Sequence, residues 1–304
     1  MCIAWMVFFS NAMIFARYYR KHWPNTKPCG LAMWFQLHRL LNMIGIGLTI
    51  ASFACIFSSK GWQWSGPRAY QPAELNETWG SIHSMLGLLA CVAAWMQPLN
   101  AVFRCEHQSS LRIIFNILHR FCGFSAWLMA AASTMIAVRW FSGRFTSPHA
   151  ALGLFVTYVV VFGVTFIFSE VCLLDTEIAV RSSRSKMQKY HKTSASTMIA
   201  VRWFSGRFTS PHAALGLFVT YVVVFGVTFI FSEVLYIRIW WQRKNVVVSS
   251  DVEMYPIDEK DSNVILSADE EKRNRLQLVI SGVFFVVSSG TCVAICCLMG
   301  MVDE

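Results

Sequence analysis

The chain has 304 residues, of which 55% are hydrophobic and only 14% are charged, and its formal net charge is +9. Soluble proteins carry about 25% charged residues, so this composition excludes a pair of soluble domains and indicates a membrane protein with several spans. The basic residues stand beside apolar segments, where they fix orientation and contact anionic lipid, so nucleic acid is not an expected partner.

The chain begins with sixteen mainly apolar residues that run directly into a basic stretch containing Arg17, Arg20 and Lys21. A signal peptide has a basic leader and a small-residue cleavage site, and neither feature is present here. The segment therefore predicts a transmembrane helix, and because it is only about 24 Å long we expect its beginning to be missing. Basic residues mark the cytoplasmic end of a span, so the amino terminus is expected outside.

The second apolar segment, residues 34–57, is about 36 Å long as a helix and carries His38 near its start. Steps of four and three residues keep side chains on one helix face. From His38 these steps reach small or polar residues, namely Asn42, Gly45, Thr49 and Ser52. The same steps reach Gly87, Ala90, Ala94 and Gln97 after His83, and Gly123, Ala126, Ala130 and Ser133 after His119. Three such faces in successive segments predict a large flat ligand held between helices by imidazole.

The loop from residue 58 to 81 contains the glycosylation sequon Asn76-Glu77-Thr78, which is usable only on the non-cytoplasmic face. The third span, residues 82–103, is therefore expected to run inward. The fourth span, 115–138, then runs outward, and the fifth extends from residue 150 to about residue 168.

Residues 132–171 and 195–234 are identical at all forty positions. Because diverged structural repeats drift in sequence, this identity indicates either a very recent duplication or an error in assembling the coding sequence, and we favour the error. Both copies favour a span whose leading end lies outside and whose trailing end lies inside. The charged stretch that joins them would then have to cross the membrane, which its charges prevent. At least one copy is therefore expected to be misplaced.

The predicted fold is an all-α, polytopic membrane helical bundle. We divide the chain into five segments: a core at 1–171 with a truncated first helix, a basic loop at 172–194, the exact duplicate at 195–234, a polar linker at 235–275, and a last transmembrane helix and tail at 276–304.

The predicted topology places His38 and His119 near the cytoplasmic face and His83 near the outer face. Two imidazoles at one depth on neighbouring helices can bind one haem iron axially, so His38 and His119 form a complete pair. The partner of His83 is expected at the start of the truncated first helix. Polar residues inside a membrane are costly, which favours ligation, while interhelical hydrogen bonding stays open. Arg39 and Arg120 directly follow histidines. One interpretation is that they pair with haem propionates or with an anionic donor, and the other is that they extend to the membrane interface.

Six sequence fragments, taken in order, resemble one known family. They are AWMVFFSNAMIFARYYR at 4–20, WFQLHRLL at 34–41, GW at 61–62, IHSMLG at 82–87, MQPLNAVFR at 96–104 and FNILHRFCG at 115–123. They resemble the cytochrome b561 family, specifically the transmembrane part of its ferric-chelate reductase 1 or stromal-cell-derived receptor 2 type, in which an extracellular DOMON domain precedes the helices.

The resemblance implies a four-helix haem-binding core with additional spans around it. It also implies two b-type haems, with His38, His83 and His119 at the positions of the family's axial ligands. The family's first histidine and its DOMON domain would both be expected before Met1. The implied function is transmembrane electron transfer by an oxidoreductase, from a cytosolic donor such as ascorbate to a ferric complex outside. Two alternatives stay open: a non-redox membrane receptor or scaffold, and an inactive product of a faulty gene model. The lipid bilayer is the expected surrounding, and a homodimer stays open.

Overall fold

The computed structural model describes residues 1–20, 22–23, 26–102, 111–185, 234 and 268–300. The predicted duplicate at 195–234, apart from residue 234, and most of the predicted linker lie outside the described residues. Within the described residues every regular element is helical, which confirms the predicted all-α class.

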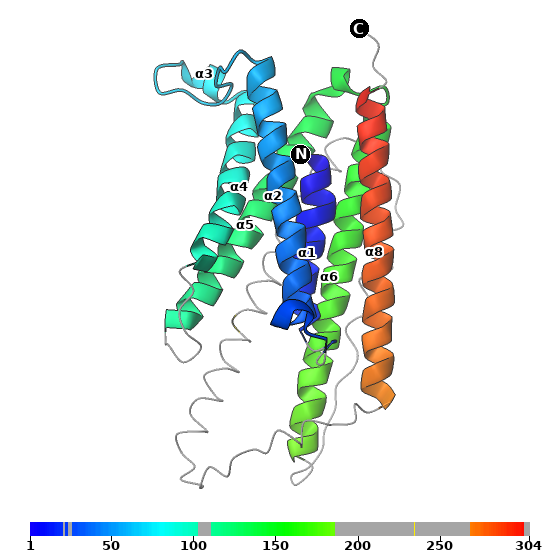
Figure 1. Cartoon of the computed structure of the whole chain (residues 1–304). Coiled ribbons are helices and arrows are strands. Elements are labelled where there is room, and N and C mark those ends of the chain that lie inside the picture. The colour runs from blue at the N-terminus through cyan, green and yellow to red at the C-terminus, as the bar shows by residue number, and fades with distance from the viewer. Residues whose placement is uncertain (21, 24–25, 103–110, 186–233, 235–267, 301–304) are drawn as a thin grey trace. The chain divides into compact units, whose positions relative to one another are not determined.

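The longer helices are α1 (Ser10–Tyr18), α2 (Met33–Ser59), α4 (Trp79–Val102), α5 (Leu111–Trp140), α6 (Pro148–Ser185) and α8 (Ala268–Gly300), as Figure 1 shows. The shorter ones are η1 (Ile3–Phe9), η2 (Pro28–Gly30), α3 (Ala73–Asn76) and η3 (Ser142–Arg144). Among the described residues, five helices are long and apolar enough to cross a membrane: α2, α4, α5, α6 and α8. The protein is therefore an integral membrane protein with several spans.

The helix ends differ from the predicted spans at a few places. Helix α4 begins at Trp79, three residues before the predicted start, because the Thr78 hydroxyl accepts a hydrogen bond from the backbone N–H of Ser81 and caps the helix. Helix α6 continues to Ser185, well past the predicted end near residue 168. Residues 169–185 contain no glycine or proline, so nothing in the backbone interrupts the helix there.

The first helix is short and starts irregularly. Residues Ile3–Phe9 form a π-helix that continues into α1. The Ser10 hydroxyl donates to the Trp5 carbonyl at 2.8 Å, and the Asn11 amide donates to the Val7 carbonyl at 2.7 Å. These bonds satisfy two polar side chains that are buried in an apolar bundle, and π-helical turns of this kind are frequent at functional sites.

The chain folds into two units, one comprising Met1–Phe166 with Gln277–Glu304 and the other Ile167–Leu276. In the first unit, η1 and α1 pack against α2, and α4 packs against α5 along its length (Figure 1). The Tyr19 hydroxyl donates to the carbonyl of Gln277, and the backbone N–H of Thr146 donates to the carbonyl of Leu298. These two bonds join α8 to the bundle near Gln277 and near Leu298.

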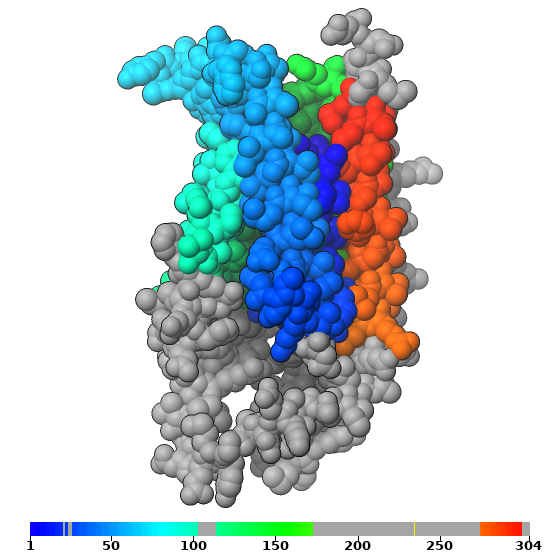
Figure 2. Space-filling model, in the orientation of Figure 1, coloured from blue at the N-terminus to red at the C-terminus, as the bar shows by residue number. Residues whose placement is uncertain are grey.

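Helix α2 presents its small residues to the bundle and its large ones outward. Only Gly45 and Thr49 are buried on this helix. Leu40, Met43 and Ile50 are exposed, and Figure 2 shows α2 at the surface along most of its length. Large apolar side chains facing lipid and small ones facing neighbouring helices are typical of membrane bundles. Two members of the small polar face predicted for this span, Gly45 and Thr49, therefore face the bundle.

Candidate functional site

His38 of α2 and His119 of α5 lie next to each other. Their ring centres are 6.3 Å apart and the ring planes are inclined by 71°. The ring of Phe115, one turn before His119, stacks on that imidazole at 5.7 Å. The two rings predicted as a ligand pair therefore lie close together in the fold, and their ligation stays a prediction.

A backbone carbonyl of α1 fixes the tautomer of His38. Its Nδ1 lies 2.9 Å from the carbonyl oxygen of Ala12. Because a carbonyl oxygen only accepts, Nδ1 carries the proton and Nε2 keeps its lone pair. Metal-binding histidines commonly donate their second N–H to a carbonyl in this way, which orients the ring and raises its basicity. The Asn42 amide nitrogen, one turn later, donates to the His38 carbonyl at 2.7 Å and lies 3.4 Å from Nε2 of the ring.

The spacing of the two rings fits a metal bound between them. A metal–imidazole bond is about 2 Å long and the ring centre lies roughly 1 Å further away, so two imidazoles that bound one metal would have their centres roughly 6 Å apart. No cluster of three or more histidine, cysteine or acidic side chains suited to a metal occurs in the described part of the chain. A pair of imidazoles is sufficient only where the metal brings its other ligands with it, as haem iron does.

The small residues near the histidines serve different purposes. A Cβ atom at Gly45 would lie 2.9 Å from the ring of Phe9, so this glycine lets η1 approach α2. A Cβ at Gly87 would lie 3.4 Å from the Ser133 hydroxyl, in ordinary contact with α5. A Cβ at Gly123, one turn after His119, would meet no atom within 4 Å. Of these three glycines, only Gly123 borders open space.

The buried amide of Gln97 lies on the same face of α4 as His83. Neither Nε2 nor Oε1 has a hydrogen-bond partner among the described residues, although both are shielded from solvent. His83 of α4 contacts Ser133 of α5, and the two helices run in opposite directions. Gln97 lies fourteen residues after His83, and His119 lies fourteen residues before Ser133. Gln97 is therefore at the level of His119. An unpaired buried polar group costs about 1–3 kcal/mol, which makes Gln97 a candidate partner for a bound group at this level.

His83 lies at the other end of α4, about 21 Å along the helix from the level of His119. Its Nδ1 is 2.9 Å from the Ser133 carbonyl oxygen and 3.0 Å from the Ser133 hydroxyl oxygen. The Ser133 hydroxyl donates to the His83 carbonyl at 3.2 Å. As at His38, a carbonyl of a neighbouring helix places the proton on Nδ1 and leaves Nε2 with its lone pair.

The two candidate arginines form local hydrogen bonds. Arg39 is exposed and donates to the Gln36 side-chain oxygen at 2.7 Å. Arg120 donates from Nε to the Asn116 carbonyl at 3.1 Å, within its own helix. Both stand beside the histidine pair in sequence, where a guanidinium is suited to an anionic group.

The sequence pattern did not predict the part played by Ala12. The contribution comes from a main-chain oxygen, and every residue has one, so no side-chain pattern could indicate it. Only the packing of α1 on α2 brings this carbonyl to His38.

Comparison with known proteins gives one family and a set of relatives. The family model of eukaryotic cytochrome b561 matches residues 1–142. The human ferric-chelate reductase 1 is 33% identical over 138 residues, which cover 45% of this chain and 20% of that protein. A putative ferric-chelate reductase 1 of Xenopus laevis is 32% identical over 138 residues, covering 45% of this chain and 21% of that protein. A putative homologue from Drosophila melanogaster is 29% identical over 139 residues, covering 46% and 19%.

The matched region thus spans about a fifth of the length of these curated relatives. No solved structure matches the chain. The family match covers the helices that carry His38, His83 and His119, and the helical membrane bundle agrees with it. Residues 1–142 therefore form a region similar to the eukaryotic cytochrome b561 family.

Proposed function

We propose that the protein transfers electrons across a membrane through haem b held by His38 and His119. The observation that carries the proposal is the pairing of the two imidazoles at 6.3 Å, together with the Ala12 carbonyl that leaves Nε2 of His38 unprotonated. The cytochrome b561 family binds haem b. When bound, the haem supplies the iron that is reversibly reduced and oxidised, while the protein sets its ligands and surroundings.

The residues around the pair have distinct roles in this proposal. His38 and His119 hold the iron, and the Ala12 carbonyl orients His38. The amide of Gln97 pairs with a polar edge of the bound group, and Gly123 leaves room beside it. Arg39 and Arg120 attract the propionates or an anionic electron donor, because a guanidinium group binds carboxylates through paired hydrogen bonds.

The substrates are proposed from the relatives, whose names identify them as ferric-chelate reductases. We assign the donor to the cytosol, as a small reductant such as ascorbate, and the acceptor to the outside, as a ferric complex. His83 is proposed as one ligand of a second haem near the outer face. Its Nδ1 is engaged by Ser133 in the way that Ala12 engages His38, so Nε2 is left for a metal.

Absorbance spectroscopy of the purified protein tests the proposal. We expect a reduced-minus-oxidised spectrum of a bis-histidine haem, strongly diminished by His38→Ala and by His119→Ala. His149→Ala is the matched control, because His149 is exposed near the start of α6 and should leave the spectrum unchanged. A stable, folded protein that binds no haem would reject the proposal and favour a non-redox receptor or scaffold.

The orientation is a separate proposal, with the amino terminus outside and the His38 end of the bundle in the cytoplasm. Cys29 is exposed in the segment between α1 and α2 and so lies at that end. A membrane-impermeant thiol reagent should leave Cys29 unlabelled in intact cells and label it after permeabilisation. A Cys29→Ser variant identifies the label, and labelling of Cys29 in intact cells would reverse the orientation.

A further inference from the structure

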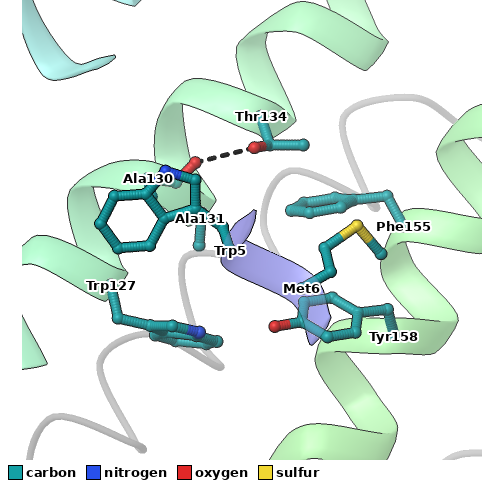
Figure 3. Close-up of a pocket in the computed structure, with 8 residues that line it drawn as sticks. All are labelled: Trp5, Met6, Trp127, Ala130, Ala131, Thr134, Phe155 and Tyr158. Carbon is teal, nitrogen blue, oxygen red and sulfur yellow. Dashed lines mark hydrogen bonds between the residues drawn. The ribbon is translucent and has the colours of Figure 1, made fainter. Parts of the chain in front are cut away.

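Three side chains from three helical segments meet at one buried hydroxyl group. The Ser10 oxygen lies 2.6 Å from the hydroxyl of Tyr158 on α6 and 2.9 Å from the indole nitrogen of Trp127 on α5. Ser10 is fully buried, and Tyr158 and Trp127 are each only 2% exposed. Figure 3 shows the Tyr158 hydroxyl directed toward Trp127, with Trp5 nearby.

The donor in each hydrogen bond of this cluster follows from which groups can only donate and which can only accept. The indole N–H of Trp127 only donates, so Ser10 accepts from it. The Ser10 proton goes to the Trp5 carbonyl at 2.8 Å, which can only accept. Tyr158 must therefore donate its own proton to Ser10. The Ser10 oxygen accepts two hydrogen bonds and donates one, so its hydrogen-bonding capacity is complete.

The packing around the cluster leaves little space for solvent. A cavity of about 10 Å³ lies beside it, lined by residues that include Trp5, Trp127 and Tyr158. This volume is at the lower limit for a single water molecule, which occupies at least about 10–15 Å³ on this measure. The position of α1 is therefore set by direct contacts between side chains.

The cluster is close in sequence to the carbonyl that orients His38. Ser10 precedes Ala12 by two residues on α1, and the Ala12 oxygen accepts from His38 Nδ1. Tyr158 lies beyond residue 142, so the family match does not include it. We propose that Tyr158 is a positioning residue for the His38–His119 site: by donating to Ser10 it holds α1 where the Ala12 carbonyl meets His38.

The proposal predicts whether the reduction midpoint of the haem rises or falls when Tyr158 is altered, and this prediction rests on the proposed haem function. A hydrogen bond from Nδ1 makes an imidazole ligand more basic and favours the oxidised metal. Tyr158→Phe keeps the ring and removes only the hydroxyl. When α1 loosens, the Nδ1 bond weakens, and the reduction midpoint of the haem held by His38 should rise.

The repeated sequence offers a matched control. Tyr221 occupies the position in 195–234 that Tyr158 occupies in 132–171, and the neighbouring residues are the same in both copies. Redox titration should show a raised midpoint for Tyr158→Phe and an unchanged one for Tyr221→Phe. Equal midpoints for Tyr158→Phe and the unaltered protein would overturn the proposal, as would a shift produced by Tyr221→Phe instead.

A second measurement does not depend on haem. In haem-free protein with ¹⁵N-labelled histidine, magnetic resonance should detect the His38 Nδ1–H proton bonded to a carbonyl, assigned by its loss in His38→Ala. Tyr158→Phe should shift this signal or make it exchange faster with solvent, while Tyr221→Phe should not. An unaltered signal in Tyr158→Phe would overturn the positioning role. Absence of haem from the unaltered protein would defeat the proposed function, and the resonance would still decide the role of Tyr158.

Discussion

Two glycines of α2 provide a comparison between close packing and open space. A Cβ at Gly45 would lie 2.9 Å from two atoms of the Phe9 ring, whereas a Cβ at Gly47 would meet nothing within 4 Å. Phe9 is buried and packs on Trp5 with ring centres 4.6 Å apart, so it has little freedom to move away. We predict that the Gly45→Ala variant is less stable than the Gly47→Ala variant.

The magnitudes follow from helix propensity and packing. Replacing glycine by alanine in a helix stabilises it by about 1 kcal/mol, and this applies to both positions. At Gly45 the added methyl group also overpacks the contact with Phe9, which costs about 1–3 kcal/mol. The two variants should therefore differ by about 1–3 kcal/mol, or roughly 3–10 °C in melting temperature for a bundle of this size.

Thermal unfolding in detergent, followed by intrinsic fluorescence, measures the difference. We expect Gly47→Ala to melt at or above the temperature of the unaltered protein and Gly45→Ala to melt below Gly47→Ala. Displacement of α1 should also alter the haem spectrum of Gly45→Ala, because Ala12 and Phe9 lie on the same short helical segment. Equal melting temperatures for the two variants would refute the close contact between Phe9 of η1 and Gly45 of α2.

Three other substitutions test individual hydrogen bonds and buried groups. Gln97→Leu should raise the melting temperature of the haem-free protein, since it removes a buried unpaired amide that costs about 1–3 kcal/mol of stability. The same substitution should weaken haem binding in a titration, and stronger binding would exclude a contact between Gln97 and the haem. Thr49→Val should lower the melting temperature because the indole N–H of Trp95 loses its acceptor at 2.9 Å, while Thr49→Ser should retain it. Ser133→Ala should cost about 1 kcal/mol in unfolding measurements, since the hydroxyl bond to the His83 carbonyl is lost; an unchanged stability would contradict that bond.

The sequence predicted the faces of the helices well because membrane helices obey a simple rule of burial. Small and polar residues four and three positions apart had to face other helices, and Thr49 and Ser133 are indeed buried. The pairing of His38 with His119 followed from their equal depth in the expected topology, and the structure brings the two rings together.

Other parts of the site depend on packing that a side-chain pattern does not specify. The four-three steps predicted space for a ligand beside Gly45, yet the Phe9 ring fills that space. Nothing in the pattern indicated that Ser10, Trp127 and Tyr158 would share one hydroxyl group, because their distances along the chain are large. The irregular start of the first helix likewise depends on the local bonds of Ser10 and Asn11 to main-chain carbonyls.

Electron paramagnetic resonance of the oxidised protein at low temperature tests most directly whether His38 and His119 share one iron. The unaltered protein should give a low-spin ferric signal, and His38→Ala and His119→Ala should each abolish the same component of it. A low-spin component that survives either substitution unchanged would contradict a haem bound between these two histidines.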